Sequence, residues 1–117
     1  MEVVRIQVEA LRHANEPRPN AGIWTTYRFT SPANHKVTGP YGRFLQMIKT
    51  PRNRAFLRAG SARVEPVRIT DQYAGVRVVL TGEDGRASSY LFSLSKQTEG
   101  RYKDCWMTDS VAPADSE

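Results

Sequence analysis

A small set of ionisable side chains in this sequence could carry proton-transfer chemistry. They are His13, His35, Asp71, Asp104 and Asp109, with Tyr27, Tyr90 and Trp106 as hydrogen-bond donors. A carboxylate or imidazole in a dry pocket can act as a general acid or base, because burial changes its pKa. On the last predicted strand, Asp104 shares a face with Trp106, and Asp109 lies on the opposite face. If Trp106 points inward, Asp104 becomes a buried carboxylate beside Tyr27 or Tyr90; the alternative is a solvent-exposed aspartate at the strand's end.

Other kinds of site lack the residues that they need. His13 and His35 have no carboxylate or thiol at metal-ligand spacing, so we expect no metal site and no cofactor. Cys105 has no histidine beside it in the sequence and is expected to be a small buried residue rather than a nucleophile. As the single cysteine, it cannot form an internal disulfide, and it fits a reducing, intracellular compartment.

The net charge of +5 is unevenly distributed along the 117 residues. No acidic residue occurs between Glu16 and Glu65, although nine lysines and arginines do. We therefore expect a positive surface that attracts phosphates, an acidic protein or anionic lipid; the alternative is a solvated basic face without a partner. Charge alone would also suit nucleic acid, but no recognised binding motif is present. The residues expected to form this basic block are Arg43, Lys49, Arg52, Arg54 and Arg58.

Hydrophobic spacing predicts three helices in the first half of the chain, over residues 2–14, 21–29 and 38–50. Pro17 and Pro19 prevent the first helix from continuing, and Thr38-Gly39-Pro40 is typical of a helix start. Residues 30–37 read as a loop by composition. Residues 52–60 are expected to form a short extended piece that packs over the open end of the core through Phe56 and Leu57.

From residue 61 onward, apolar residues recur with a period of two, which predicts four antiparallel strands over residues 63–70, 73–81, 86–96 and 101–111. The side chains expected to face the helices are Val76, Val78, Leu80, Tyr90, Phe92 and Leu94. The opposite, outer face carries Tyr73, Arg77, Val79 and Leu91. A half-apolar outer face suggests a homodimer or a docked subunit, and the alternative is a solvent-exposed sheet.

The chain is expected to be one domain over residues 1–111, followed by a flexible tail at 112–117. No apolar run approaches the roughly 18 residues needed to span a bilayer. The first residues show neither a signal peptide nor a transit peptide.

The local sequence resembles the nuclear transport factor 2-like, or SnoaL-like, superfamily, in which three helices precede a curved antiparallel meander. It is similar to an uncharacterised plant and algal branch that includes plastid proteins and the C-terminal part of certain plant F-box proteins. The F-box itself has no counterpart here, so a ubiquitin-ligase role does not transfer. The matching stretches are Ile6-Gln7-Val8-Glu9-Ala10-Leu11, Glu16-Pro17-Arg18-Pro19-Asn20, Gly22-Ile23, Tyr27-Arg28-Phe29, Ser31-Pro32, Thr38-Gly39-Pro40, Arg43-Phe44 and Trp106-Met107-Thr108-Asp109-Ser110.

The resemblance implies an α+β fold, a cystatin-like cone of three N-terminal helices on a curved antiparallel sheet, and a plastid location. Ketosteroid isomerases, polyketide cyclases and scytalone dehydratases of the superfamily work inside the cone, but this branch has no established activity to carry over. The residues expected around the cone interior are Trp24, Tyr27, Phe44, Tyr90, Phe92 and Trp106.

The function expected first is a non-enzymatic binding or accessory module with the basic block as its partner surface. A cone filled by aromatic side chains favours this reading. The alternative is a small-molecule-binding enzyme of the isomerase or dehydratase type, with Asp104 and Tyr27 as catalytic candidates. A hollow cone with an inward Asp104 would favour the enzyme.

Overall fold

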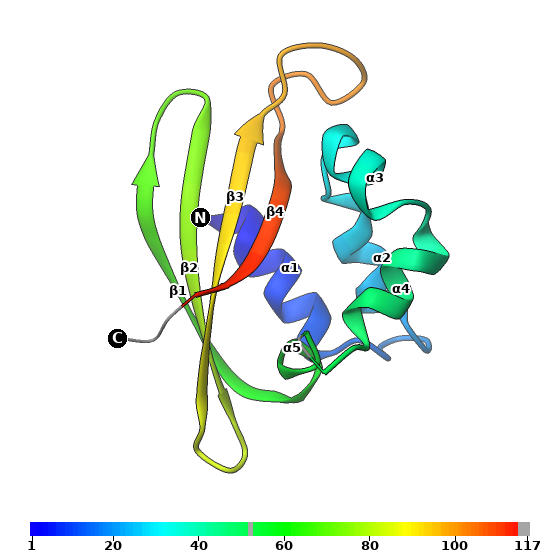
Figure 1. The fold of residues 1–117 in the computed structure, drawn as a ribbon, viewed down its shortest axis with the longest axis vertical. Coiled ribbons are helices and arrows are strands. Elements are labelled where there is room, and N and C mark those ends of the chain that lie inside the picture. Colours follow the sequence, from blue (N-terminus) through cyan, green and yellow to red (C-terminus); the bar gives the residue numbers. More distant parts are fainter. Residues whose placement is uncertain (52, 115–117) are drawn as a thin grey trace.

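The computed structural model describes residues 1–51 and 53–114, and in this part of the chain five helices precede four strands (Figure 1). The helices are α1 (Glu2–Arg12), α2 (Ala21–Arg28), α3 (Pro32–Thr38), α4 (Tyr41–Ile48) and α5 (Ala55–Arg58). The strands are β1 (Ala59–Ile69), β2 (Tyr73–Gly82), β3 (Ala87–Lys96) and β4 (Trp106–Ala114). The strands pair antiparallel in the order β1-β2-β3-β4, so the predicted α+β class and the antiparallel meander are confirmed.

The helical half contains two elements that the sequence pattern did not predict. Residues 30–37 were expected to be a loop, but most of them form α3. Ser31 is the cap of this helix, since its side-chain oxygen accepts a hydrogen bond from Asn34 N at 3.1 Å, and Pro32 occupies the first helical turn. The expected extended piece at 52–60 instead contains the single-turn helix α5, whose Phe56 is buried in the core.

A close contact between α1 and α2 fixes the angle of the helical layer. Gly22 is buried, and a Cβ atom placed on it would lie 1.8 Å from the carbonyl oxygen of Ala10. The Gly22 amide donates to the carbonyl of Ala14 at 2.9 Å. Only a residue without a side chain allows this approach. The same contact brings Thr26 of α2 within 3.4 Å of the Gln7 carbonyl of α1.

The inner face of the sheet matches the predicted alternation. Val76, Val78 and Leu80 of β2 are buried, as are the three predicted residues of β3, Tyr90, Phe92 and Leu94. Together with the apolar stripe of α1 and with Phe56, they form the core between the two layers. The alternation is reliable in β2 and β3 because both strands pair along their whole length without a bulge.

The fourth strand differs from its prediction at both ends. It begins at Trp106 rather than 101, because residues 101–104 form a turn. It continues to Ala114, so the first three residues of the expected tail belong to the sheet; residues 115–117 lie outside the described part.

A β-bulge interrupts β4 at Asp109. Leu94 pairs with Thr108 and Ser93 pairs with Ser110, so Asp109 has no partner of its own in the register. Directly opposite residues of an antiparallel pair lie on the same face. Thr108, opposite the buried Leu94, and Val111, opposite the buried Phe92, therefore both face the helices.

Candidate functional site

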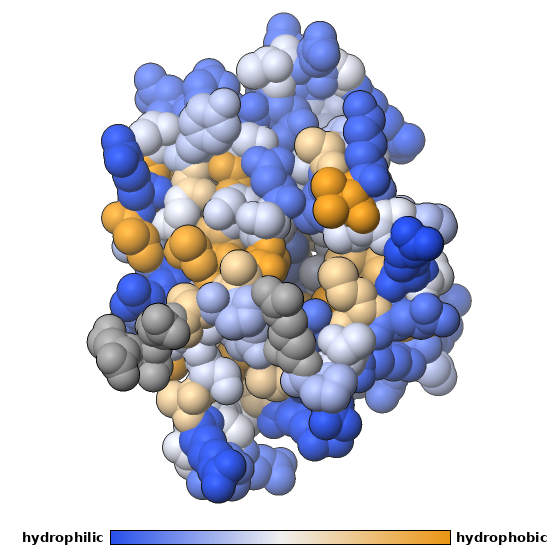
Figure 2. Space-filling view, viewed as in Figure 1, coloured by the Kyte–Doolittle hydropathy of each residue, from blue (hydrophilic) through white to orange (hydrophobic). Residues whose placement is uncertain are grey.

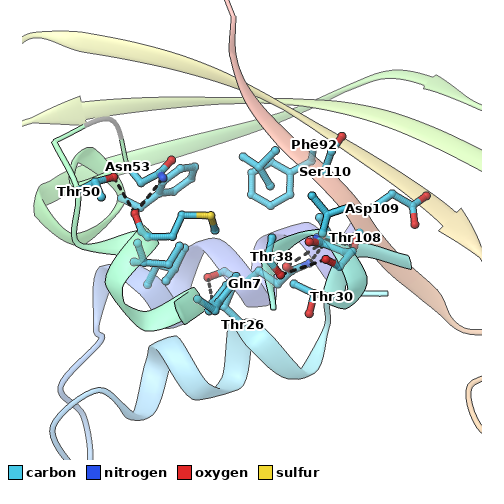
Figure 3. A pocket seen from close by; sticks show the side chains of 18 residues that line it. Gln7, Thr26, Thr30, Thr38, Thr50, Asn53, Phe92, Thr108, Asp109 and Ser110 are labelled. Atoms are coloured by element: carbon cyan, nitrogen blue, oxygen red, sulfur yellow. Dashed lines mark hydrogen bonds between the residues drawn. The ribbon is translucent and has the colours of Figure 1, made fainter. Parts of the chain in front are cut away.

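A cavity of about 330 Å³ lies between the helical layer and strands β3 and β4. It opens on the face shown in Figure 2, where the surface is hollowed near its centre and apolar side chains gather beside the hollow. The apolar part of its wall consists of Leu11, Val37, Phe44, Met47, Ile48, Phe56, Phe92 and Val111. The polar part consists of Gln7, Thr26, Thr30, Asn34, Thr38, Thr50, Asn53, Thr108, Asp109 and Ser110. The interior of the domain is thus hollow and only partly apolar (Figure 3).

The deepest polar contact in the cavity wall joins Gln7 of α1 to Thr108 of β4. Gln7 is only 1% exposed. Its Nε2 donates to the Thr108 hydroxyl at 2.9 Å and to the Val3 carbonyl at 3.2 Å, and the Thr108 hydroxyl donates to Gln7 Oε1 at 3.1 Å (Figure 3). Because buried polar groups are costly when unpaired, this reciprocal bonding explains how a polar pair is tolerated inside the core.

The backbone of Thr108 also attaches β4 to the start of α3. The Thr108 amide donates to the Phe29 carbonyl at 2.8 Å, and the Ser31 amide donates to the Thr108 carbonyl at 2.8 Å. Asn34 Nδ2 donates to the same carbonyl at 3.1 Å. The cap at Ser31 therefore positions Asn34 in the cavity wall, one helical turn after the point where α3 meets the sheet.

Thr30 and His35 form a hydroxyl–imidazole pair beside the cavity, which raises the question of nucleophilic or base chemistry. The Thr30 hydroxyl donates to the Tyr27 carbonyl at 2.5 Å and also contacts His35 Nε2. His35 Nε2 lies 3.3 Å from the same carbonyl, which can only accept a hydrogen bond. Because the Thr30 proton is already donated to the Tyr27 carbonyl, it is not directed at the imidazole, and we interpret the pair as structural. The Tyr27 ring stacks on His35 with centroids 4.4 Å apart and an interplanar angle of 11°.

Asp109 is the one ionisable side chain among the described residues that line the cavity. It is half-buried and makes no ion pair or hydrogen bond through its carboxylate to the described residues. Figure 3 shows its side chain directed away from Gln7 and Thr108. The bulge accounts for this direction, because Asp109 is the extra residue that follows the inward-facing Thr108 and has no partner on β3.

Neither catalytic candidate of the enzyme alternative, Asp104 or Tyr27, lines the cavity. Asp104 is exposed, has a positive φ of 69°, and belongs to the turn that precedes β4, so of the two alternatives for this side chain the structure has the solvent-exposed one. The strand alternation expected there does not apply, because residues 101–104 form a turn and β4 begins only at Trp106. Tyr27 is half-buried against His35 and is not part of the cavity wall.

Two of the six residues predicted around the interior, Phe44 and Phe92, line the cavity. Tyr90 is buried behind the wall against Phe56, with ring centroids 4.4 Å apart. Trp24 is 48% exposed and packs edge-on against Tyr41 at 4.9 Å, so its assignment to the interior is wrong. It lies on the outer side of α2, where helical spacing alone could not separate it from its neighbours.

Trp106 is half-buried at the start of β4 and is likewise absent from the cavity wall. The ammonium of Lys96 lies over its ring at 5.5 Å from the centroid. Next to it, Cys105 is exposed, which corrects the expectation of a buried thiol. Its position in the connection before β4, rather than within a strand, is the reason.

The polar wall itself was not predicted. Apart from Asp109, its members are uncharged amides and hydroxyls, which no titrating or metal-binding pattern marks in the sequence. One signal was available in the sequence: Gln7 lies within the apolar stripe formed by Val4, Val8 and Leu11. A polar residue on the buried face of an amphipathic helix needs an internal partner, and here the partner is Thr108.

The basic block is exposed where the structure describes it. Arg43, Lys49, Arg54 and Arg58 are all exposed, and none forms an ion pair with a described carboxylate. Arg52, the remaining member, lies outside the described residues.

On the outer face of the sheet, Tyr73 is 66% and Leu91 38% exposed. Val79 is half-buried and Arg77 is exposed. Arg77 and Leu91 are opposite each other in the β2–β3 register, so a charged and an apolar side chain lie side by side on this face.

Among the described residues, no cluster of three or more histidine, cysteine, aspartate or glutamate side chains could bind a metal ion. None of the described helices has both the length and the apolar character needed to cross a membrane. Comparisons of the chain with family models, with curated proteins and with solved structures found no match.

Proposed function

We propose that this chain is a non-enzymatic binding module whose cavity takes up a small, mostly apolar molecule. The interior is hollow, rather than filled by aromatic side chains as expected for an accessory module, but Asp104 does not face it. The observation that carries the proposal is that the buried polar groups of this hollow interior are amides and hydroxyls. A volume of about 330 Å³ is close to the lower end of the roughly 300–1,000 Å³ typical of ligand pockets. Phe44, Phe56 and Phe92 supply the apolar surface that binds such a molecule.

The alternative, an isomerase or dehydratase, has less support. General acid–base catalysis needs a titrating group within hydrogen-bond reach of the substrate. Asp104 is in an exposed turn, Asp109 is directed away from the polar floor, and His35 is not part of the cavity wall. The polar groups that remain in the wall can orient a ligand, but they do not exchange protons near neutral pH.

The test is to close the cavity at its rim without disturbing the core. Val111 is 37% exposed and lines the cavity, so Val111→Trp should block the opening. Val67→Trp is the matched control, because Val67 is a β-strand valine, 61% exposed, that is absent from the cavity wall. The probe is N-phenyl-1-naphthylamine, a neutral dye whose fluorescence rises in apolar surroundings.

We expect saturable one-to-one binding of the dye to the unmodified chain and to Val67→Trp, and at least about tenfold weaker binding to Val111→Trp, equivalent to about 1.4 kcal/mol. Melting temperatures of the two variants should agree within a few degrees. Failure of the unmodified chain to bind, or equal binding by both variants, would contradict the proposed function.

A second candidate function rests on the basic block. We propose that Arg43, Lys49, Arg54 and Arg58 form a surface for an anionic protein partner. Their exposure and their lack of ion pairs among the described residues support this proposal, since intramolecular pairing would have made them structural. Ligand uptake and partner binding are compatible, because the two use different side chains.

We also propose that the chain is a member of the nuclear transport factor 2-like superfamily with a cone-shaped fold, as its sequence resemblance implies. Helices packed on one face of an antiparallel meander, with a cavity between the layers, support this proposal. The half-apolar outer face around Tyr73, Val79 and Leu91 supports a homodimer through the sheet. The plastid location stays a prediction from the resemblance.

A further inference from the structure

The hydrogen bonds already made inside the cavity wall restrict the chemistry of its ligand. We propose that the cavity selects a small apolar molecule that donates hydrogen bonds, such as a phenol or an amine, over one that only accepts them. The proposal rests on the proposed binding function and adds the class of ligand to it.

Three threonine hydroxyls of the wall already donate hydrogen bonds to backbone carbonyls. Thr26 donates to the Gly22 carbonyl at 3.0 Å, Thr38 to the Asn34 carbonyl at 3.0 Å and Thr50 to the Met47 carbonyl at 2.7 Å. A hydroxyl has one proton and two acceptor lone pairs. Each of these side chains can therefore only accept a further hydrogen bond.

Gln7 and Thr108, at the floor of the cavity, have no proton left to donate to a ligand. Both N–H bonds of Gln7 Nε2 are used, by the Val3 carbonyl and by the Thr108 hydroxyl. The Thr108 proton is used by Gln7 Oε1. Thr30 donates to the Tyr27 carbonyl. This part of the wall offers no proton to a ligand.

The two asparagines of the wall, Asn34 and Asn53, present their carbonyl oxygens. Asn34 Nδ2 donates to the Thr108 carbonyl and Asn53 Nδ2 to the Met47 carbonyl, both at 3.1 Å. Neither Oδ1 accepts a hydrogen bond within the described residues. Because every buried side-chain nitrogen or oxygen there has a partner, an oxygen without one is not buried. Both Oδ1 atoms are therefore accessible.

Against these acceptors the wall retains few donors. They are one N–H on each asparagine and the hydroxyl of the exposed Ser110. Asp109 adds a carboxylate, which accepts hydrogen bonds and carries a negative charge. Acceptors outnumber donors, and the one charge in the described wall is negative. Such a wall favours hydroxyl and amine ligands and disfavours carboxylates.

The experiment compares two pairs of similar ligands, and in each pair a methyl group replaces the proton that can be donated. 4-Methylphenol donates and accepts, whereas 4-methylanisole only accepts; N-methyl-4-toluidine and N,N-dimethyl-4-toluidine form the second pair. Each is titrated by calorimetry, and by displacement of N-phenyl-1-naphthylamine, against the unmodified chain and Val111→Trp. We expect the donor of each pair to bind about 5- to 10-fold more tightly than its methylated partner, as one net hydrogen bond predicts. Val111→Trp should weaken all four ligands.

Charge gives an independent comparison at neutral pH. 4-Methylbenzylamine, a cation, should bind more tightly than the anion 4-methylbenzoate, and Asp109→Asn should reduce that preference several-fold. Asp109 is half-buried without a partner in the described chain, so this substitution should be tolerated.

The outcomes separate the two proposals. If donors and methylated partners bind equally and Val111→Trp weakens both, the cavity binds ligands but the donor preference is wrong. Tighter binding of the ethers or of 4-methylbenzoate would also overturn the preference. If neither the dye nor any of these ligands binds, the proposed function itself fails.

Discussion

Gly22→Ala should destabilise the domain strongly, although alanine is the better helix former. Gly22 is the second residue of the eight-residue helix α2. Its added Cβ would lie 1.8 Å from the Ala10 carbonyl oxygen and 2.8 Å from Ala14 Cα, both backbone atoms that cannot rotate away. Helices α1 and α2 would have to separate. That movement would also lengthen the 2.9 Å bond from the Gly22 amide to the Ala14 carbonyl.

The expected loss can be worked out from these contacts. Overpacking costs about 1–3 kcal/mol, and a 1.8 Å backbone contact belongs at the upper end of that range. The weakened hydrogen bond adds about 1 kcal/mol, and the higher helix propensity of alanine recovers about 1 kcal/mol. The free energy of unfolding should therefore fall by about 3 kcal/mol. For a chain of this size, the melting temperature should fall by roughly 10 °C.

The matched control is Gly42→Ala. Gly42 is also the second residue of an eight-residue helix, α4, but no atom lies within 4 Å of its added Cβ. This variant should be unchanged or stabilised by up to about 1 kcal/mol. Urea unfolding followed by circular dichroism measures both variants. Equal stability of the two alanine variants would refute the close approach of α1 and α2.

Three further predictions follow from side-chain contacts and exposure. Gln7→Leu and Thr108→Val should each lower the free energy of unfolding by about 1–3 kcal/mol, because each leaves a buried partner unpaired. The double variant should lose less than the sum of the two, and additive losses in urea unfolding would refute the pairing. The double variant Arg54→Ser/Arg58→Ser should change the free energy of unfolding by less than about 0.5 kcal/mol, because both side chains are exposed. It should elute from an anionic resin at lower salt than the unmodified chain, and unchanged retention would argue against the basic surface. Leu91→Lys should lower the mass measured by light scattering if the outer sheet face forms a dimer, with melting unchanged; a monomeric unmodified chain would exclude that dimer.

The sheet was predictable where alternation alone decides the structure. β2 and β3 pair without a bulge, so every second residue is buried and the six predicted inward side chains are in the core. The same rule failed in β4, because a turn occupies residues 101–104 and a bulge occurs at Asp109. Both irregularities depend on pairing with other segments, which the local sequence does not encode. Asp104 was misplaced for that reason.

In the helical layer, the local sequence was compatible with more than one structure. Residues 30–37 were expected to be a loop, whereas Ser31-Pro32 within them is the cap and first turn of α3. Trp24 and Ile23 are adjacent on α2, yet only Ile23 is buried. The choice between them depends on where α1 crosses, which the contact at Gly22 determines.

The hydrogen bond between Gln7 and Thr108 joins residues 101 positions apart in the chain. This separation has a consequence for synthesis on the ribosome. At about 5–20 residues per second, roughly 5–20 s pass between translation of the two residues. During that interval the apolar stripe of α1 has no β4 to close the cavity, and the Gln7 amide can pair only with water or its own helix. The side chains of the future cavity wall therefore stay exposed to solvent in the nascent chain until β4 has emerged.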